Sequence, residues 1–308
     1  MRKMKKAGLG QNTFKSKLFY TLLVLLPSLQ FLFFYVFVNL NSFALAFKIF
    51  PTGIAKEFEW GWDNFTYWFT NQVRNTEMKL AIGNSLKSYA ISMCTGLPLG
   101  LFFSYYMFKR MPGAKLFRIL LFMPSILSAA VLATIYKNVT GLVLGGANGL
   151  LSKWTGEVIN FWDAEHRYTS MMVFCVFASF GTSVLMYTNK MDAIAPEIIE
   201  SAHLDGANGV KEFWYIVLPQ IFSIMQVFLI SGFAGIFTNQ YNFMMLFGYE
   251  QPDVQPLGFL LWRGVARAGG NTTQMGPYAA LGLIITFIIV PLTFLLRWTL
   301  GKIGWKEE

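Results

Sequence analysis

Charge is scarce in this sequence: Asp, Glu, Lys and Arg together make up 13% of its 308 residues, about half the share found in an average soluble protein. Hydrophobic residues account for 55% and aromatic residues for 17%, so the chain is expected to lie in a lipid bilayer. The net charge of +9 does not point to nucleic acid, because the cytoplasmic loops of membrane proteins collect Lys and Arg. No soluble segment interleaves basic and aromatic residues, so nucleic acid is not an expected partner.

Cysteine and histidine are almost absent, with two residues of each. Cys94 and Cys175 lie inside apolar runs, which predicts two small buried side chains and neither a disulfide nor a metal site. His166 and His203 fall in segments predicted on opposite sides of the membrane, so they are not expected to share a metal. No G-x-x-x-x-G-K-[ST] phosphate loop and no nucleophile-base pair occurs. The chain is therefore not expected to be an enzyme or to hold a cofactor of its own.

Long apolar runs dominate what is present. A run of about 20 such residues crosses the hydrocarbon layer as a helix, and six stretches have this length. They are 18–38, 80–108, 116–136, 168–188, 219–237 and 278–300. The first follows basic residues as in a signal peptide, but it is too long and lacks a small-residue cleavage site, so it is expected to remain as a span. The sequence therefore predicts an all-α integral membrane protein with six transmembrane helices.

Basic residues predict the orientation of these spans. Before the first span lie Arg2, Lys3, Lys5, Lys6, Lys15 and Lys17, with no acid among them. The short loop after the second span carries Lys109, Arg110, Lys115 and Arg118. Both segments are expected in the cytoplasm, and an even number of spans then puts the N and C termini on that side.

The loop between the fourth and fifth spans, "EIIESAHLDGANGVKEFWYIVLPQI" over 197–221, is unusually acidic for a cytoplasmic loop. Pro196 suits the first turn of a helix, where its missing N–H costs nothing. An apolar stripe at a spacing of four is formed by Ile194, Ile198 and Ala202. The pattern predicts a short amphipathic helix at this point.

Gly206 permits a left-handed turn after that helix. A second short helix is expected over about 210–217, before Pro219 opens the fifth span, so that both helices lie across the membrane surface. Helices that rest on anionic lipid present Lys and Arg, whereas this loop presents acids. A protein partner is therefore the better explanation of the loop.

The order Glu200-Ser201-Ala202, Gly206 and Leu218-Pro219 resembles the "EAA" signature of the membrane subunits of ATP-binding-cassette importers, with Ser201 where that family most often has Ala. The surrounding "ESAHLDGA" is similar to the carbohydrate-uptake branch, which includes the maltose and glycerol-3-phosphate permeases. Further segments that resemble the family are "WDNFTYWF" at 62–69, "AIGNSLKSYAIS" at 81–92, "LFRILLFMPSILSAAVLATIY" at 116–136 and "MGPYAALGLI" at 275–284.

The resemblance implies the fold of a type I importer permease. Its expected parts are a basic cytoplasmic N-terminus (1–17), a first transmembrane helix with an external segment (18–79), a core of five transmembrane helices (80–300) and a cytoplasmic tail (301–308). It also implies a location in a bacterial-type inner or plasma membrane. The function implied is that of a permease subunit that forms half of a translocation pathway for a sugar.

In that family the loop, here about 190–218, is a coupling helix that docks on a separate ATPase subunit. The resemblance assigns charged contacts to Glu200 and Asp205, a close fit to Ser201 and Ala202, and the turn to Gly206. ATP and Mg would be bound by the ATPase subunit. The implied partners are a second homologous permease, two copies of the ATP-binding subunit and an extracytoplasmic solute-binding protein.

Polar side chains in or beside the spans are candidates for the solute pathway, because they are costly there unless they face a cavity or another helix. These candidates are Ser179, Thr182, Asn239, Gln240 and Tyr241. Amides and hydroxyls beside an aromatic face suit a sugar, and Asn239 resembles by position a sugar-contacting Asn of the maltose permease. Hydrogen bonds between helices would explain the same residues equally well. An oligosaccharide is the expected solute, with glycerol phosphate or another polar solute as alternatives.

A self-contained secondary carrier of a polar solute is the alternative function. Such carriers contain inverted repeats and ionisable residues within their spans. The sequence has no clear internal repeat, and Lys87 is the main charge inside a span. The coupling signature favours the importer subunit.

Overall fold

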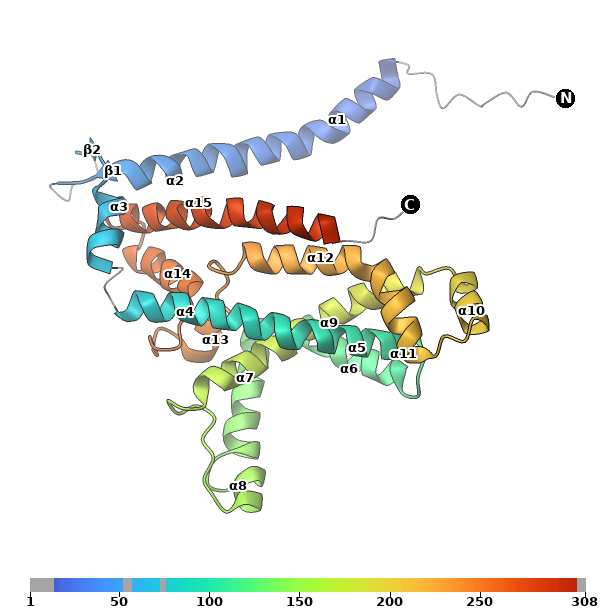
Figure 1. The fold of residues 1–308 in the computed structure, drawn as a ribbon. Helices are drawn as coiled ribbons and strands as arrows, with labels where there is room; N and C mark the ends of the chain where they lie inside the picture. Colours follow the sequence, from blue (N-terminus) through green and yellow to red (C-terminus); the bar gives the residue numbers. More distant parts are fainter. Residues whose placement is uncertain (1–13, 52–56, 73–75, 304–308) are drawn as a thin grey trace.

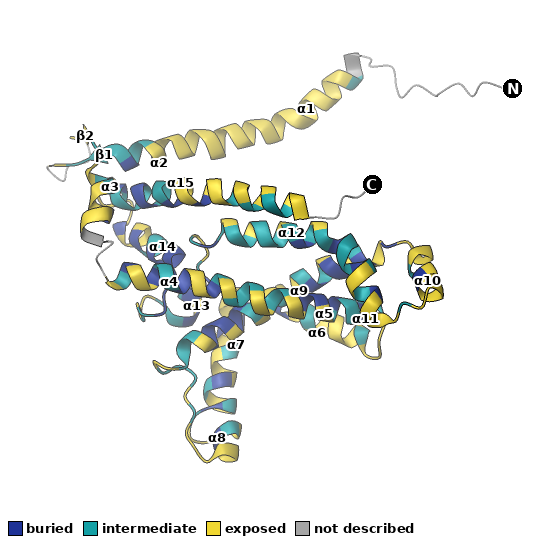
Figure 2. Cartoon of the chain, in the orientation of Figure 1, coloured by how far each residue is buried: buried dark blue, intermediate teal, exposed yellow. Residues whose placement is uncertain are grey.

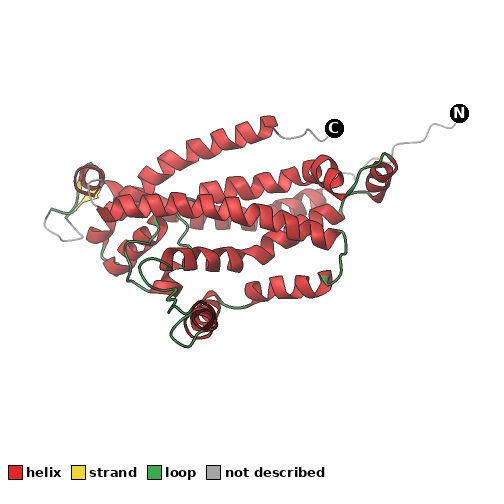
Figure 3. Cartoon of the chain, turned by 60° about the horizontal axis from the view of Figure 1, so that its bottom comes forward, coloured by secondary structure: helices red, strands yellow, loops and turns green. Residues whose placement is uncertain are grey.

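The structure, a computed structural model, describes residues 14–51, 57–72 and 76–303 and is almost entirely helical (Figure 1). Figure 3 shows that the only strands in this described part form one small hairpin at the edge of the bundle. An all-α architecture was predicted from the apolar runs and is confirmed. The basic residues predicted before position 14 and the end of the predicted tail, 304–308, lie outside the described residues.

The helices follow one another closely along the chain. They are α1 (Phe14–Gln30), α2 (Val38–Phe47), α3 (Asp63–Tyr67), α4 (Thr76–Ile91), α5 (Leu97–Phe108), α6 (Ala114–Ile126), α7 (Ala129–Asn138), α8 (Leu150–Thr155), α9 (Arg167–Asp192), α10 (Pro196–Leu204), α11 (Gly209–Glu212), α12 (Leu218–Ala234), α13 (Phe243–Phe247), α14 (Leu257–Ala268) and α15 (Thr272–Ile303). Short π-helical segments are η1 (Phe31–Phe37), η2 (Trp68–Gln72), η3 (Ser92–Gly96), η4 (Val139–Leu144) and η5 (Phe213–Val217). The antiparallel hairpin pairs β1 (Lys48–Ile49) with β2 (Glu59–Trp60).

Five helices of the described part are long and apolar enough to cross a membrane. They are Ser16–Phe47, Thr76–Phe108, Arg167–Asp192, Gly209–Ala234 and Thr272–Ile303. They correspond to the first, second, fourth, fifth and sixth predicted spans. Each is longer than its apolar run, because the helical backbone continues into flanking residues.

The third predicted span is not one straight helix. The helical segments Ala114–Ile126 and Ala129–Leu144 are bent by 111° relative to each other. The run 116–136 is therefore a broken span or a re-entrant loop, and it counts as the sixth span only if the bent pair crosses the membrane as one unit. Leu127 between them is extended, and the Ser128 side chain caps α7 by accepting a hydrogen bond from the Val131 N–H. A serine that caps a helix marks the start of that helix, so α6 has to end before it. A hydropathy average does not detect such a boundary.

The α10 end of the bundle, as we call the end that carries α10 and α11, is also where α1 begins and α15 ends (Figure 1). The opposite α3 end carries α3, β1 and β2. Figure 2 shows exposed residues along most of α1, and every residue from 17 to 43 is exposed. The first helix therefore offers its apolar side chains to lipid or to another chain, and it meets its own bundle mainly where α2 lies beside α15.

Three apolar clusters hold the remaining helices together. One joins α2, α4, α14 and α15, a second joins α7, α9, α13 and α14, and the third joins α5, α9 and α12 toward the α10 end. Close backbone approach at glycine tightens this packing, as is usual between membrane helices. A Cβ added at Gly181 of α9 would lie 1.9 Å from the carbonyl oxygen of Leu121 on α6.

Buried polar side chains of α4 fix the chain segment that leads into α14. The Asn84 amide donates to the carbonyl oxygens of Asp253 and Gln255, at 2.8 and 3.1 Å. The Ser85 hydroxyl accepts from the Leu257 N–H at 2.9 Å. These contacts satisfy backbone groups that water cannot reach. Asn84 and Ser85 therefore fix the position of the segment that leads into α14.

Candidate functional site

α10 stands off the bundle between α9 and α11 (Figure 1). It begins as predicted with Pro196 in its first turn. It ends with Gly206 in the left-handed region, at φ 80°, where the Gly206 N–H donates to His203 O at 3.0 Å and the Ala207 N–H to Ala202 O at 2.9 Å. This pair of bonds is a Schellman motif, which satisfies the last carbonyls of a helix. The predicted turn at Gly206 is confirmed.

The second predicted surface helix is not separate. α11, η5 and α12 form one continuous helix, Gly209–Ala234, so the short helix over 210–217 and the opening of the span at Pro219 were wrong. Asn208 caps this helix by accepting from the Lys211 N–H at 3.1 Å. Pro219 is tolerated inside it because the π-helical segment η5 directly before it widens the turn that the proline ring would otherwise meet.

The inward face of α10 also differs from the predicted stripe. Ile194 and Ala202 are buried as expected, but Ile198 is exposed, and Ile199 packs inward in its place. Ala195 is extended and precedes the helix, so Ile194 does not share the helical phase of the residues after Pro196. Within α10 the inward side chains are thus Ile199 and Ala202, at a spacing of three, and Ile198 of the predicted stripe lies outside that face.

Four of the five predicted coupling residues face outward. Glu200, Ser201, Asp205 and Gly206 are exposed, and Leu204 beside them is 89% exposed. Ala202 instead lies buried against its own chain. The outward surface of α10 and its turn thus combines two carboxylates with a solvent-exposed leucine side chain. Such a surface is suited to contact with another protein.

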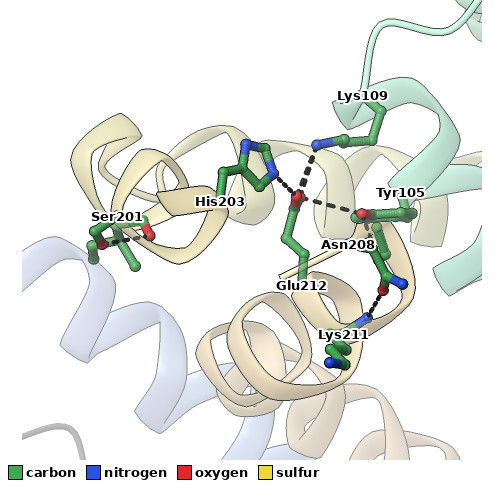
Figure 4. Close-up of polar contacts among 9 residues, drawn as sticks. Tyr105, Lys109, Ser201, His203, Asn208, Lys211 and Glu212 are labelled. Atoms are coloured by element: carbon green, nitrogen blue, oxygen red, sulfur yellow. Dashed lines mark hydrogen bonds and ion pairs between the residues drawn. The ribbon is translucent and has the colours of Figure 1, made fainter. Parts of the chain in front are cut away.

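A buried carboxylate anchors this loop to the bundle (Figure 4). Glu212 on α11 is 0% exposed, and its two oxygens each lie 3.0 Å from Lys109 Nζ at the end of α5. His203 Nε2 on α10 lies 2.6 Å from Glu212 Oε2. Tyr105 Oη lies 3.2 Å from Glu212 Oε1 and 2.9 Å from the Gly209 carbonyl oxygen. One carboxylate therefore connects α5, α10 and α11, which we call the Glu212 cluster.

The sequence carried one signal for this cluster that we did not use. Glu212 is the sole acid between 209 and 234 and directly precedes the apolar "FWYIVLP". By sequence Glu212 belongs to the acidic loop 197–221 and Lys109 to the basic loop after the second span. Their pairing joins residues 103 positions apart, which no local pattern reveals.

The predicted solute-pathway residues divide between two places. Asn239, Gln240 and Tyr241 lie in a break between α12 and α13 and not inside a helix. Tyr241 and Asn242 have φ of 49° and 54°, and the Asn239 side-chain oxygen accepts from the Tyr241 N–H at 2.8 Å. Backbone that leaves the helix at membrane depth occurs where it is covered by protein or lines a water-filled cavity.

α9 meets this break through Cys175, whose thiol lies 3.1 Å from the Tyr241 carbonyl oxygen. A cavity of 240 Å³ beside it is lined by Ser179 and by Asn242, which directly follows the predicted residues Asn239, Gln240 and Tyr241. Thr182 is exposed on the same helix and does not line that cavity. Ser179 is thus brought to the break, whereas Thr182 is not.

The two cysteines behave differently from each other. Cys175 is buried as predicted, but Cys94 is exposed, because the apolar run that contains it faces outward at η3. Among the described residues, no group of three or more His, Cys, Asp and Glu side chains could hold a metal ion.

Gly206 allows a direct test of the turn. No atom lies within 4 Å of a Cβ added there, so only its positive φ resists a side chain. Gly206→Val is expected to lower the free energy of unfolding by about 1–2 kcal/mol, measured by thermal unfolding of the purified protein. Gly206→Asn is the matched control, since Asn tolerates this conformation, and a loss as large as that of valine would contradict the turn.

Comparison with known proteins fits this arrangement. The family model described as "Binding-protein-dependent transport system inner membrane component" matches residues 96–303. The "Multiple sugar-binding transport system permease protein MsmF" of Streptococcus mutans is 25% identical over 287 residues, which cover 92% of this chain and 94% of that protein. The "Arabinooligosaccharides transport system permease protein AraP" of Bacillus subtilis is 24% identical, over 85% of this chain and 82% of its own.

A solved structure shares the fold. A chain of the bacterial alginate ABC transporter, crystallised with an alginate pentasaccharide-bound periplasmic protein, superimposes with a TM-score of 0.76 at 17% identity and covers 95% of this chain and 98% of its own. The family match spans two thirds of the sequence and includes α10, the Glu212 cluster and the break after α12. This multi-pass membrane protein therefore belongs to the family of binding-protein-dependent transport system inner membrane components.

Proposed function

We propose that the chain is the membrane-spanning permease subunit of an ATP-binding-cassette importer and forms half of the translocation pathway for a sugar. The observation that carries this proposal is the exposed surface of α10, held on the bundle by the Glu212 cluster. A family match over 96–303 and relatives whose names refer to oligosaccharide and multiple-sugar transport support an oligosaccharide as the solute.

The proposed coupling follows from how α10 is attached. A partner ATPase that holds Glu200, Ser201 and Asp205 would move α10 when its own subunits close on ATP and Mg. Through the Glu212 cluster this displacement reaches α5, and through Gly209–Ala234 it reaches the break at 235–242. Packed helices respond by rigid-body rocking, which would alternate access to the break from the two sides of the membrane.

The proposed assembly has this chain beside a second, homologous permease, on two copies of the ATPase, with a solute-binding protein outside. Both termini and the α10 end then lie in the cytoplasm of a bacterial-type cell, and the five helices within 80–300 form the core. Residues 17–43 of the first helix are not buried by their own bundle. In the proposed assembly this helix packs against the neighbouring permease.

The proposed solute pathway passes the break after α12. Carbonyl groups there, with Asn239, Gln240 and the Ser179 hydroxyl, supply hydrogen bonds for sugar hydroxyls, and Tyr241 supplies an aromatic ring. α14 approaches the break closely, because a Cβ on Gly258 would lie 2.4 Å from the Thr238 carbonyl oxygen. The break is thereby kept in one shape, as a selective site requires.

Affinity purification of the tagged protein from its native membrane tests the proposal. Wild-type protein is expected to carry a second permease and an ATPase with it. Glu200→Lys reverses a charge on the outward face of α10 and is expected to reduce the recovered ATPase about tenfold, while the second permease is retained. Glu197→Lys is the matched control, since Glu197 is an exposed acid on the same helix outside the predicted contact set.

Two results would contradict the proposal. Intact protein that emerges alone, while a known importer survives the same detergent, favours a self-contained carrier. Equal ATPase recovery with Glu200→Lys and Glu197→Lys would leave the importer in place but remove α10 as its coupling surface.

A further inference from the structure

A large cavity at the α10 end plays no part in the proposed coupling. Its volume is 640 Å³, and it lies where the turn between α5 and α6 meets the end of α9. Three cationic side chains line it, Arg110, Lys115 and Arg118, together with the single acid Asp192. The lining thus has a formal charge of +2, from three cations and one carboxylate.

The three cations are unpaired, in contrast with their neighbour. Lys109 is bound to the buried carboxylate of Glu212, whereas Arg110, Lys115 and Arg118 form no ion pair within the described part of the chain. Arg110 also adopts a left-handed φ of 50°, a conformation that favours glycine. Cations gathered around one cavity repel one another unless an anion lies between them.

An apolar surface leads away from this cavity along α6. Ile119 and Ile126 lie four and eleven residues after Lys115, on the same face of the helix, and are 67% and 81% exposed. This face extends for about 16 Å from Lys115 along α6. A ligand that satisfies both parts has an anionic head and an apolar chain.

We propose that this cavity binds the headgroup of an anionic phospholipid, whose phosphate lies among Arg110, Lys115 and Arg118 and whose acyl chain follows the exposed face of α6. Basic pockets between membrane helices on the cytoplasmic side recognise such headgroups. A free phosphate would leave the apolar face of α6 unused. An acidic segment of a protein partner would meet the cations but not the apolar face, so lipid fits both observations.

Native mass spectrometry of the full-length protein with added dioleoyl phosphatidylglycerol or phosphatidylcholine tests the inference. Phosphatidylglycerol is expected to bind at least about tenfold more tightly than phosphatidylcholine. The triple variant Arg110→Gln, Lys115→Gln and Arg118→Gln is expected to lose this preference, because each basic residue near the membrane surface contributes several-fold to the affinity for anionic lipid.

The matched control removes the same charge elsewhere at the α10 end. Lys17→Gln, Arg297→Gln and Lys302→Gln change three exposed cations and are expected to alter phosphatidylglycerol affinity less than about twofold. Lys115→Gln alone provides the comparison if the triple variant fails to give a single folded species. Equal weakening in both triple variants would overturn the site, because general surface charge would then explain the binding.

Two further results would also overturn it. Displacement of phosphatidylglycerol by millimolar inorganic phosphate would show a simple phosphate site. Loss of the bound lipid whenever the ATPase subunit is attached would assign the cavity to a protein partner. These outcomes do not depend on whether the chain transports a sugar, so the inference stands or falls separately from the proposed function.

Discussion

Replacing Lys109 with methionine is expected to lower the free energy of unfolding by about 3–5 kcal/mol, because it leaves the Glu212 carboxylate buried without its cation. The two partners are not equivalent: the side chain of Lys109 is 30% exposed and that of Glu212 is 0% exposed. Glu212→Gln keeps the shape of the side chain and lets Lys109 turn toward water. It is therefore expected to cost only about 1–2 kcal/mol.

Loss of Lys109 is thus expected to destabilise the protein more than loss of the Glu212 charge. Thermal unfolding of detergent-solubilised variants measures both changes, and the double variant Lys109→Met with Glu212→Leu is expected to recover part of the loss, as apolar replacements of buried ion pairs do. Additive losses, or a larger loss from Glu212→Gln than from Lys109→Met, would contradict the burial of this carboxylate. Folded Lys109→Met protein should also transport poorly, since α10 loses the ion pair in its connection to α5 and only the Tyr105 hydrogen bonds remain.

Gly181→Ala is expected to remove most folded protein. The added Cβ would lie 1.9 Å from the carbonyl oxygen and 2.9 Å from the carbonyl carbon of Leu121, so α6 and α9 have to separate along their backbones. Overpacking of this kind costs about 3 kcal/mol or more when no flexible side chain can move aside. The measurement is the yield and melting temperature of the monodisperse protein by size exclusion.

Gly282→Ala on α15 is the matched control. It introduces the same methyl group into a membrane helix, but no atom lies within 4 Å of it. We expect it to change stability by less than about 1 kcal/mol, the difference in helix propensity. A sharp elution peak and an unchanged melting temperature for Gly181→Ala would show that α6 does not rest on the α9 backbone.

The long spans could be predicted from the sequence because burial in lipid requires only length and hydropathy, which are local. The bend before α7 could not, since a hydropathy average over 116–136 does not register that the Ser128 hydroxyl caps a new helix. The inward face of α10 was also predicted incorrectly, because Ile199 and not Ile198 packs against the bundle. In both cases the structure depends on a detail at one residue, and a hydropathy pattern that extends over many residues does not reveal that detail.

The local features of the candidate site could also be predicted from the sequence, whereas its long-range contacts could not. The turn at Gly206 follows from a glycine after a short helix, and its outward neighbours follow from their polarity. The anchor of that loop was not predicted, because Glu212 and Lys109 meet only in the folded chain. The break after α12 has left-handed backbone at Tyr241 and Asn242. Asn tolerates this conformation, but Tyr does not favour it, so the residue types alone did not predict the shape of the break.

The hydrogen bonds of Asn84 and Ser85 have a consequence for biosynthesis. Their partners follow 169 to 172 positions later in the chain. A ribosome that adds about 5–20 residues per second needs roughly ten to thirty seconds to reach them. During that interval α4 has left the ribosome with an amide and a hydroxyl that its own chain cannot yet satisfy. We therefore expect the position of α4 in the bundle to become fixed only after the start of α14 has been made.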